Sequence, residues 1–177
     1  MKKFFEISLL LFLSVALCAC PYSSAYNIDE VPGIYVEDAL LGKWATYVKS
    51  KDKKKEEAVY LTLTRHTDTE YNIAFSGNLD ALKLYKHITS DSLAGTAFMS
   101  TIGNRQFCNI KINARIYIAE LIIADDNISL LPLAEHFTSK MIFSSKELRS
   151  AVHFHYKTRV HPVIDEDFCL RNMTKIN

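Results

Sequence analysis

The chain has 177 residues, of which 49% are hydrophobic and 23% are charged, and its formal net charge is +1. These values fit one globular domain and exclude a disordered chain, which would be poorer in apolar residues. A single stretch is apolar enough to be membrane-active, so a polytopic membrane protein is excluded as well. The small net charge argues against a dedicated nucleic-acid binder, which needs a basic surplus to neutralise phosphates.

The N-terminus has the features of an export signal. Lys2 and Lys3 give it a positive start, and residues 7–17 form an apolar run that only two serines interrupt. This run is about half of the roughly 20 residues that a membrane-spanning helix needs. We therefore expect a cleaved signal peptide over residues 1–19, and not a permanent transmembrane anchor.

The end of this run and the three residues after it, Leu17-Cys18-Ala19-Cys20, resemble the lipobox of bacterial lipoproteins. That motif has Leu at position −3 and a small residue at position −1, before the modified Cys. The resemblance implies that Cys20 is diacylated on its thiol, becomes the first mature residue and is acylated on its new amino group. Cys18 departs from the motif, which usually has a small aliphatic or hydroxyl residue there. Several acyl chains on one residue form a stable membrane anchor, because each buried CH₂ contributes about 0.8 kcal/mol.

The location in the cell envelope follows from the same resemblance. Pro21 stands where an Asp would favour retention of a bacterial lipoprotein in the inner membrane, so the outer membrane is the expected location. The alternative is ordinary signal cleavage after Ala25, which would release a secreted or periplasmic soluble protein. Residues 20–35 contain Pro, Gly and Ser without hydrophobic periodicity and are interpreted as a lipidated tether. Residues 36–177 are then expected to form one β-rich domain.

The middle of the chain shows the period of two that is typical of β-strands. Strands are predicted over 45–48, 59–64, 71–76, 97–101, 107–112, 116–123 and 128–131, and segment 81–88 is either a strand or a helical turn. The charge cluster at 49–57 is interpreted as a solvated hairpin loop, not as a contact for anionic headgroups, because its acids largely cancel its lysines.

One helix is predicted near the end of the chain. Ser144 and Glu147 have capping-box spacing, and an apolar stripe follows at helical spacing, formed by Leu148, Ala151, Val152 and Tyr156. A closing strand is predicted over 168–173. The fold expected from this order is mainly β. It is an antiparallel meander that closes into a barrel or half-barrel, with one C-terminal helix packed on it.

Gly42-Lys43-Trp44, at the start of the first predicted barrel strand, resembles the Gly-x-Trp motif of lipocalins and related calycins. The resemblance covers three residues and the strand count. It implies that Trp44 closes one end of the barrel and that a basic side chain from late in the chain packs on it. Arg171, Arg149 and Arg159 are the candidates for that side chain. The chain is also similar to small bacterial lipoproteins that have a Trp-bearing first strand and no assigned activity.

Three histidines near the predicted helix, His153, His155 and His161, could supply nitrogen ligands to zinc. His153 and His155 would, however, lie about 200° apart on a helix. The alternative is a set of surface histidines near a helix end, where the dipole favours a cation. The chain has no Gly-x-Ser-x-Gly nucleophile motif and no Gly-rich phosphate loop. We therefore expect no cofactor and no catalysis.

Three further residues have two interpretations each. Glu120 is the one charged residue in predicted strand 116–123. Facing the barrel interior it could orient a polar ligand with a raised pKa, and facing outward it would be a solvated charge. The outward orientation is favoured because Glu is rarely buried. Cys108 and Cys169 form a candidate disulfide in an oxidising compartment, or else remain two buried free thiols.

The leading functional hypothesis is a non-enzymatic, membrane-anchored envelope lipoprotein that binds a small apolar ligand or an envelope protein partner. The ligand version predicts a sizeable apolar cavity in the barrel. The partner version, an inhibitor or assembly factor, predicts a filled core and an exposed apolar patch. A third hypothesis, a His-based metal-dependent enzyme, requires the three histidines and Glu120 to meet in one cleft.

Overall fold

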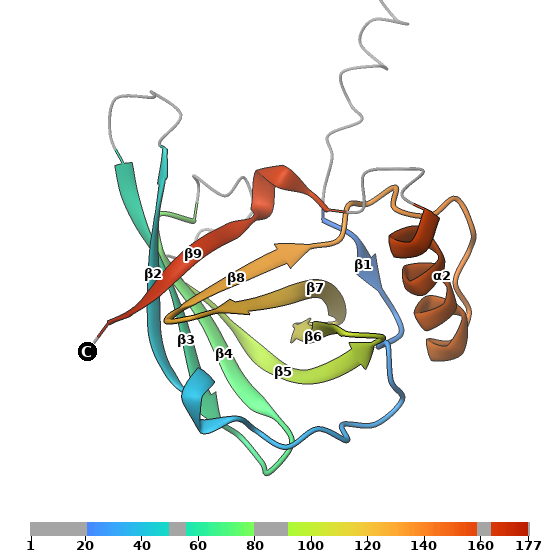
Figure 1. Cartoon of the computed structure of the whole chain (residues 1–177), viewed down its shortest axis with the longest axis horizontal. Coiled ribbons are helices and arrows are strands. Elements are labelled where there is room, and N and C mark those ends of the chain that lie inside the picture. Colours follow the sequence, from blue (N-terminus) through green and yellow to red (C-terminus); the bar gives the residue numbers. More distant parts are fainter. Residues whose placement is uncertain (1–20, 50–55, 80–91, 159–163, 177) are drawn as a thin grey trace, which may run out of the picture.

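The computed structural model describes residues 21–49, 56–79, 92–158 and 164–176. In this part of the chain, eight antiparallel strands close a barrel, and a short ninth strand and one α-helix pack on its outside (Figure 1). The prediction of a mainly β meander that closes into a barrel and carries one helix is therefore confirmed.

The barrel strands follow one another along the chain. They are β2 (Gly42–Lys49), β3 (Glu56–Arg65), β4 (Tyr71–Gly77), β5 (Ser92–Ile102), β6 (Arg105–Ile112), β7 (Arg115–Ala124), β8 (Asn127–Pro132) and β9 (Leu170–Ile176). The other elements are β1 (Ser23–Ser24), α2 (Ser145–Thr158) and the 3₁₀ turns η1 (Asp38–Leu40) and η3 (Glu166–Phe168). Each barrel strand pairs with its neighbours in sequence, and β9 also pairs with β2, which closes the ring. Predicted segment 81–88 and most of the charge cluster at 49–57 lie outside the described residues.

Alternation along the strands produces the barrel core. In β3, the side chains of Val59, Leu61 and Leu63 are at most 6% exposed and belong to the inner cluster. On the paired strand β4, Ile73 and Phe75 face the same interior. Full burial of one such side chain contributes roughly 1.5–3 kcal/mol, so this alternation provides the main driving force for closure.

Strand β5 approaches β6 very closely at Gly95. A β-carbon at Gly95 would lie 2.0 Å from the carbonyl oxygen of Lys111 in β6. A glycine is therefore required at this position, because only a residue without a side chain allows the two backbones to approach so closely.

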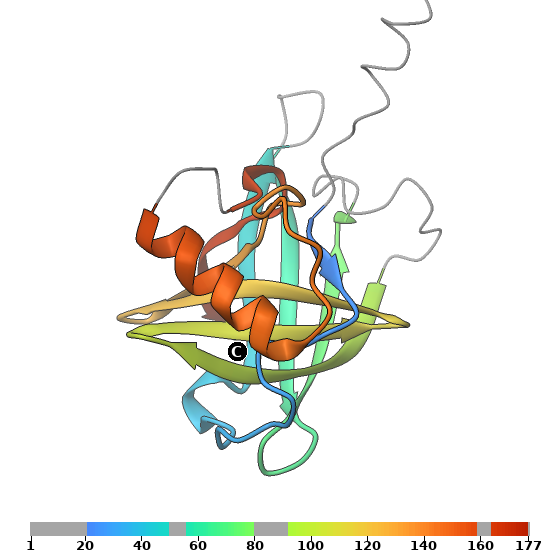
Figure 2. The ribbon, with the colours of Figure 1, turned by 90° about the vertical axis from the view of Figure 1, so that its right-hand side faces the viewer.

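A second core forms outside the barrel, under α2. Figure 2 shows this helix lying across the outer face of β5, β6 and β7. The predicted apolar stripe of the helix packs on outward-facing side chains of these strands, among them Ile102, Phe107 and Ile118. The N–H of Glu147 donates to Ser144 Oγ at 3.2 Å, as the capping pattern predicts. The Glu147 carboxylate accepts from the N–H of Phe143, one residue before the cap.

Residues 21–35 differ from the free tether that the sequence predicts, because they lie against the barrel. Ser23 and Ser24 pair with β7 as strand β1, and the N–H of Tyr22 donates to the carbonyl of Leu133 at 2.8 Å. Ile28 is 1% exposed, and its N–H donates to Asn109 Oδ1 at 2.7 Å. Two paired residues and one buried Ile are too few to produce a periodic signal, so the sequence did not reveal this attachment.

Candidate functional site

One end of the barrel is closed around Trp44. This residue is 5% exposed and belongs to the inner core, and its indole N–H donates to the carbonyl of Leu40 at 2.9 Å. Leu40, in η1, is itself buried. The N–H of Val36 donates to the carbonyl of Asp68 at 2.8 Å, which holds the chain before η1 on the β3–β4 turn. Trp44 and η1 therefore close this end of the barrel.

The basic residue that packs on Trp44 is Lys175, which was not among the predicted candidates. Lys175 Nζ lies 5.5 Å from the centroid of the indole ring and donates to the carbonyl of Ala39 at 3.1 Å. A β-carbon at Gly42 would lie 2.7 Å from Lys175 Cε, so the glycine of the Gly-x-Trp motif leaves room for this side chain. The register of β9 on β2 pairs Lys175 with Trp44, and this register is set only when the ring closes, so the sequence alone did not single out Lys175.

The three predicted arginines have other surroundings. Arg171 donates from Nη2 to both carboxylate oxygens of Glu166, at 2.8 and 2.9 Å, and this ion pair raises the Arg171 pKa above its ordinary value. Arg149 pairs with Asp29 at 2.6 Å and so fastens α2 to the N-terminal segment. Arg159 lies outside the described residues.

Glu120 faces outward from the barrel, as favoured, but it is buried and not solvated. Its neighbours on the same face of β7, Ile116 and Ile118, belong to the cluster under α2, and Glu120 is 5% exposed. One carboxylate oxygen accepts from Arg105 Nη1 at 2.5 Å and the other accepts from the Tyr156 hydroxyl at 2.8 Å. The sequence interpretation assumed that an outward-facing Glu120 would be exposed to solvent. That assumption is wrong, because α2 packs over this face of β7.

These three groups form a compact cluster between the helix and the barrel wall. The Arg105 guanidinium lies 4.4 Å from the centroid of the Tyr156 ring, which in turn contacts Phe107 edge to face. Burial raises the pKa of the Tyr156 hydroxyl, and its hydrogen bond to Glu120 raises the pKa further. The charges of Glu120 and Arg105 are thus paired, and the Tyr156 hydroxyl has a hydrogen-bond acceptor within the cluster. The cluster joins α2 to the barrel.

Both cysteines of the domain are free thiols. Cys108 faces the barrel interior, where burial raises its pKa to about 12. Cys169 precedes β9, and its Sγ donates to the carbonyl of Asp165 at 3.2 Å. Burial raises the Cys169 pKa to about 11. Of the two interpretations from the sequence, the structure has the one without a disulfide, and both thiols are poor nucleophiles.

Among the described residues, His153 and His155 do not form a metal site together. Both His153 and His155 lie within α2, so they point to different sides of the helix. His155 is buried and its ring contacts Phe137 edge to face at 5.7 Å, whereas His153 is exposed. His161 lies outside the described residues, among which no group of three His, Cys, Asp or Glu side chains is placed to hold a metal ion.

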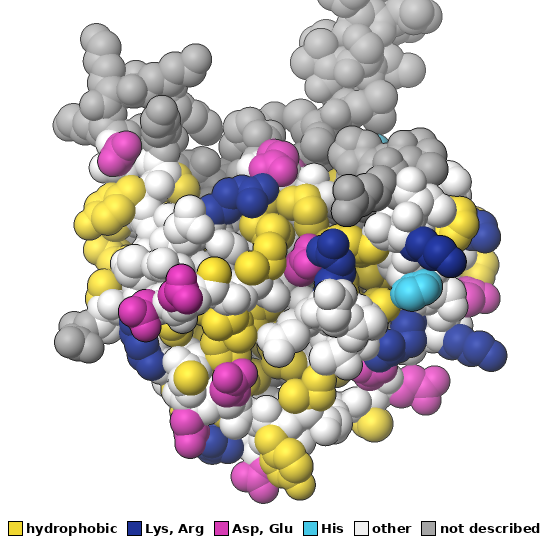
Figure 3. Space-filling model, in the orientation of Figure 1, with side chains coloured by type: hydrophobic (Ala, Val, Ile, Leu, Met, Phe, Trp, Pro, Cys, Tyr) yellow, Lys and Arg dark blue, Asp and Glu magenta, His cyan; other side chains and the backbone are white. Residues whose placement is uncertain are grey.

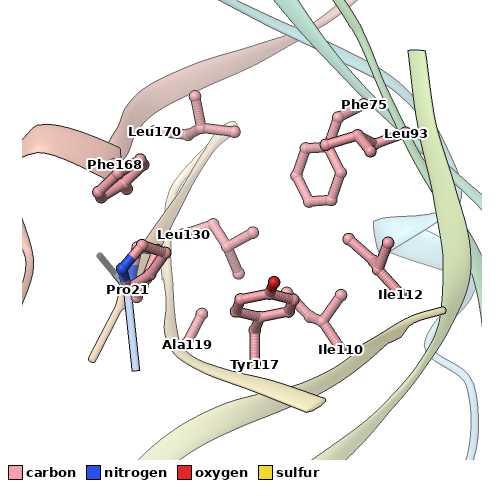
Figure 4. A pocket seen from close by; sticks show the side chains of 11 residues that line it. Pro21, Phe75, Leu93, Ile110, Ile112, Tyr117, Ala119, Leu130, Phe168 and Leu170 are labelled. Atoms are coloured by element: carbon pink, nitrogen blue, oxygen red, sulfur yellow. The ribbon is translucent and has the colours of Figure 1, made fainter. Parts of the chain in front are cut away.

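The end of the barrel opposite Trp44 contains a small apolar cavity. Strand β9 runs from this end, at Leu170, to the closed end, at Lys175. Figure 4 shows the lining side chains, which include Pro21, Phe75, Leu93 and Phe168. The cavity volume is about 40 Å³, against roughly 300 Å³ or more for a pocket that encloses a drug-sized ligand. Among the described residues, this cavity is therefore much smaller than a pocket that encloses such a ligand.

Exposed apolar side chains and open grooves flank the helix. Phe143 and Phe154 are 63% and 57% exposed, and Met141 beside them in sequence is 77% exposed. A groove of about 520 Å³ lies between α2 and the β5–β6 turn, with Phe154 and His153 on its rim. On the face shown in Figure 3, apolar side chains gather between the barrel strands and charged side chains lie mostly around them.

Asn109 is a structural residue that the sequence did not single out. It lies on the polar side of an alternating strand, yet it is 1% exposed because the N-terminal segment covers it. Its amide donates to Ser100 Oγ at 2.8 Å and to the carbonyl of Phe98 at 3.3 Å. By contrast, Arg105 could have been paired with Glu120 in advance, because the hairpin register places it diagonally across from that carboxylate.

Within the described ranges, no helix combines the length and the apolar character needed to cross a membrane. Comparisons of the chain with protein-family models, with curated proteins and with solved structures give no significant match.

Proposed function

We propose that the protein is a lipid-anchored envelope lipoprotein that acts by binding a protein partner and has no catalytic activity. The observation that carries this proposal is the small size of the apolar cavity that the described residues of the barrel form. This cavity of about 40 Å³ is too small to enclose a ligand of ordinary size, which favours the outer surface for recognition. Of the two binding modes that the sequence suggested, the small cavity supports the partner.

Attachment of the N-terminal segment supports lipidation at Cys20 over signal cleavage after Ala25. Cleavage after Ala25 would remove Pro21, strand β1 and Tyr22 from the folded protein. The Tyr22 ring packs edge to face on Phe137 at 4.7 Å, so that cleavage would also expose apolar surface. Processing before Cys20 retains all of these contacts.

The outer face of α2 is the surface that we propose for the partner. Phe143, Glu147, Ser150 and Phe154 are spaced so that they share this face, and all but Phe143 lie within the helix. The two phenylalanines are more than half exposed, and the groove beside Phe154 offers a concave neighbour. Exposed aromatic side chains beside a groove are typical anchors of protein interfaces.

Native mass spectrometry of protein extracted from its own host membrane tests the proposal directly. The expected spectrum shows three acyl chains on Cys20 and a mass increment from a bound protein, without a retained small ligand. A stoichiometric small molecule in place of a protein would overturn the partner-binding proposal. A mature chain that begins at Tyr26 would overturn the anchor.

A pair of substitutions locates the partner surface. Phe154→Glu is expected to abolish the complex, because it places a charge on the aromatic anchor. Tyr47→Glu is the matched control, since Tyr47 is 69% exposed on β2, away from the helix, and its variant should keep the complex. Equal loss from both variants, with both proteins folded by circular dichroism, would contradict the assignment to α2.

A further inference from the structure

We infer that the barrel rests on the lipid surface with its Pro21 end, so that the apolar cavity at this end faces the membrane. The inference depends on the proposed anchor at Cys20 and adds an orientation and a second interaction surface to it. The partner at this surface is the lipid layer itself.

The first step is that no linker segment separates the proposed anchor from the barrel. Pro21 forms a β-bridge with Ala134, and the next residue, Tyr22, donates its N–H to the carbonyl of Leu133. Pro21 is buried, so the chain is fixed to the barrel from this residue onward. Because consecutive Cα atoms are about 3.8 Å apart, an anchor at Cys20 leaves no tether between lipid and domain.

The second step is the position of this attachment on the barrel. Pro21 is one of the residues that line the apolar cavity (Figure 4). The anchored residue is therefore bonded to the rim of that cavity, at the end of the barrel opposite Trp44. A lipid that enters the bilayer from this point brings the same end of the barrel to the interface, where the headgroup region of one leaflet is only about 5–8 Å thick.

The third step is the chemistry of this end. Phe168, Leu93 and Phe75 contribute carbon surface to the cavity, whose volume is about 40 Å³. Among the described residues beside it, Arg171 and Glu166 are exposed charges that form an ion pair with each other. Paired charges are brought to a lipid surface at a smaller cost than isolated ones, and apolar side chains gain from it. The carbon surface of this end together with its paired charges therefore fits a lipid surface.

Fluorescence quenching in vesicles tests the orientation. The full-length protein, processed in its host, is reconstituted in phosphatidylethanolamine–phosphatidylglycerol vesicles that contain brominated acyl chains, which quench nearby tryptophan. The native Trp44 is the only Trp of the chain and lies at the far end, so its emission should be unchanged. Glu166→Trp adds a probe at the cavity end, and Tyr35→Trp adds a matched, exposed probe beside the Trp44 end.

The expected result is that the added emission of Glu166→Trp is largely lost and that of Tyr35→Trp is retained. In the wild-type protein, a photoactivatable phospholipid should label the peptide that contains Phe168 and leave the peptide around Trp44 unlabelled. If Tyr35→Trp is quenched as strongly as Glu166→Trp while Cys20 carries its acyl chains, the orientation is wrong and the anchor stands. If the mass of the N-terminal peptide shows no acylation, the anchor fails and the orientation fails with it.

Discussion

At the scale of single residues, a charge inside an apolar strand is retained because two partners from different elements satisfy it. Arg105 comes from the neighbouring strand and Tyr156 from the helix, and together they occupy both oxygens of Glu120. A buried carboxylate without such partners would carry a large desolvation penalty. The Glu120–Arg105–Tyr156 cluster therefore forms only when α2 is packed on the barrel.

Glu120→Gln should lower the free energy of unfolding by about 1–3 kcal/mol, because it leaves Arg105 without its counter-ion in a partly buried site. The matched control is Glu166→Gln, which breaks an ion pair that is exposed on both sides and should cost less than about 1 kcal/mol. Urea unfolding monitored by circular dichroism measures both. Equal losses in the two variants would show that the buried cluster has no special role.

At the scale of elements, the shortest strand depends most on its surroundings. Strand β1 has only two residues, far too few to be stable alone, and it is held by β7, by the bond from Tyr22 to Leu133 and by the ring contact of Tyr22 with Phe137. The N-terminal segment is thus a part of the fold that the barrel itself organises.

Tyr22→Ala is expected to destabilise the protein by about 2 kcal/mol, through loss of half-buried aromatic surface and of the edge-to-face contact. Tyr35→Ala, at a position 76% exposed in the same N-terminal segment, should change stability by less than about 0.5 kcal/mol. Thermal and urea unfolding of both variants provide the comparison. A negligible effect at Tyr22 would mean that β1 is not firmly attached.

At the scale of the whole molecule, two apolar cores share one wall. The inner faces of the strands fill the barrel, and the outer faces of β5, β6 and β7 pack under α2. One thiol and one phenol hydroxyl are buried in these cores, and burial raises the pKa of both, so each core contributes to the pH dependence of stability. Cys108 lies in the inner core and Tyr156 beside the outer one.

Stability should fall in alkaline solution. Burial raises the pKa of Cys108 from 9.0 to about 12, so above pH 9 the unfolded chain releases a proton that the folded protein keeps. The unfolded state then binds fewer protons, and stability declines with rising pH through this interval, whereas below pH 9 the contribution is complete. Urea midpoints measured between about pH 8 and pH 11 should show a smaller decline for Cys108→Ala than for wild type. If the urea midpoints of both proteins declined equally with pH, the Cys108 thiol would be excluded as a source of the pH dependence.

The strands, the helix and its cap could be predicted because their signals are local. The alternation of Val59, Leu61 and Leu63 and the Ser144–Glu147 spacing each depend on residues a few positions apart. The surroundings of Glu120 and Asn109 could not be predicted in the same way, because the segments that cover them are distant in sequence. A polar residue that a distant segment buries on the outer face of a strand does not change the hydrophobic alternation of that strand.

The sequence by itself determined an antiparallel meander that closes into a barrel or half-barrel, with one C-terminal helix and Trp44 in the core, since hydrophobic periodicity and turn residues specify neighbouring pairs. Only the tertiary structure decided that β9 pairs with β2 in a full ring, how large the described cavity is, that Lys175 packs on Trp44, and that residues after Pro21 belong to the fold. These features depend on side-chain volumes and contacts between distant segments, which become defined only when the ring closes.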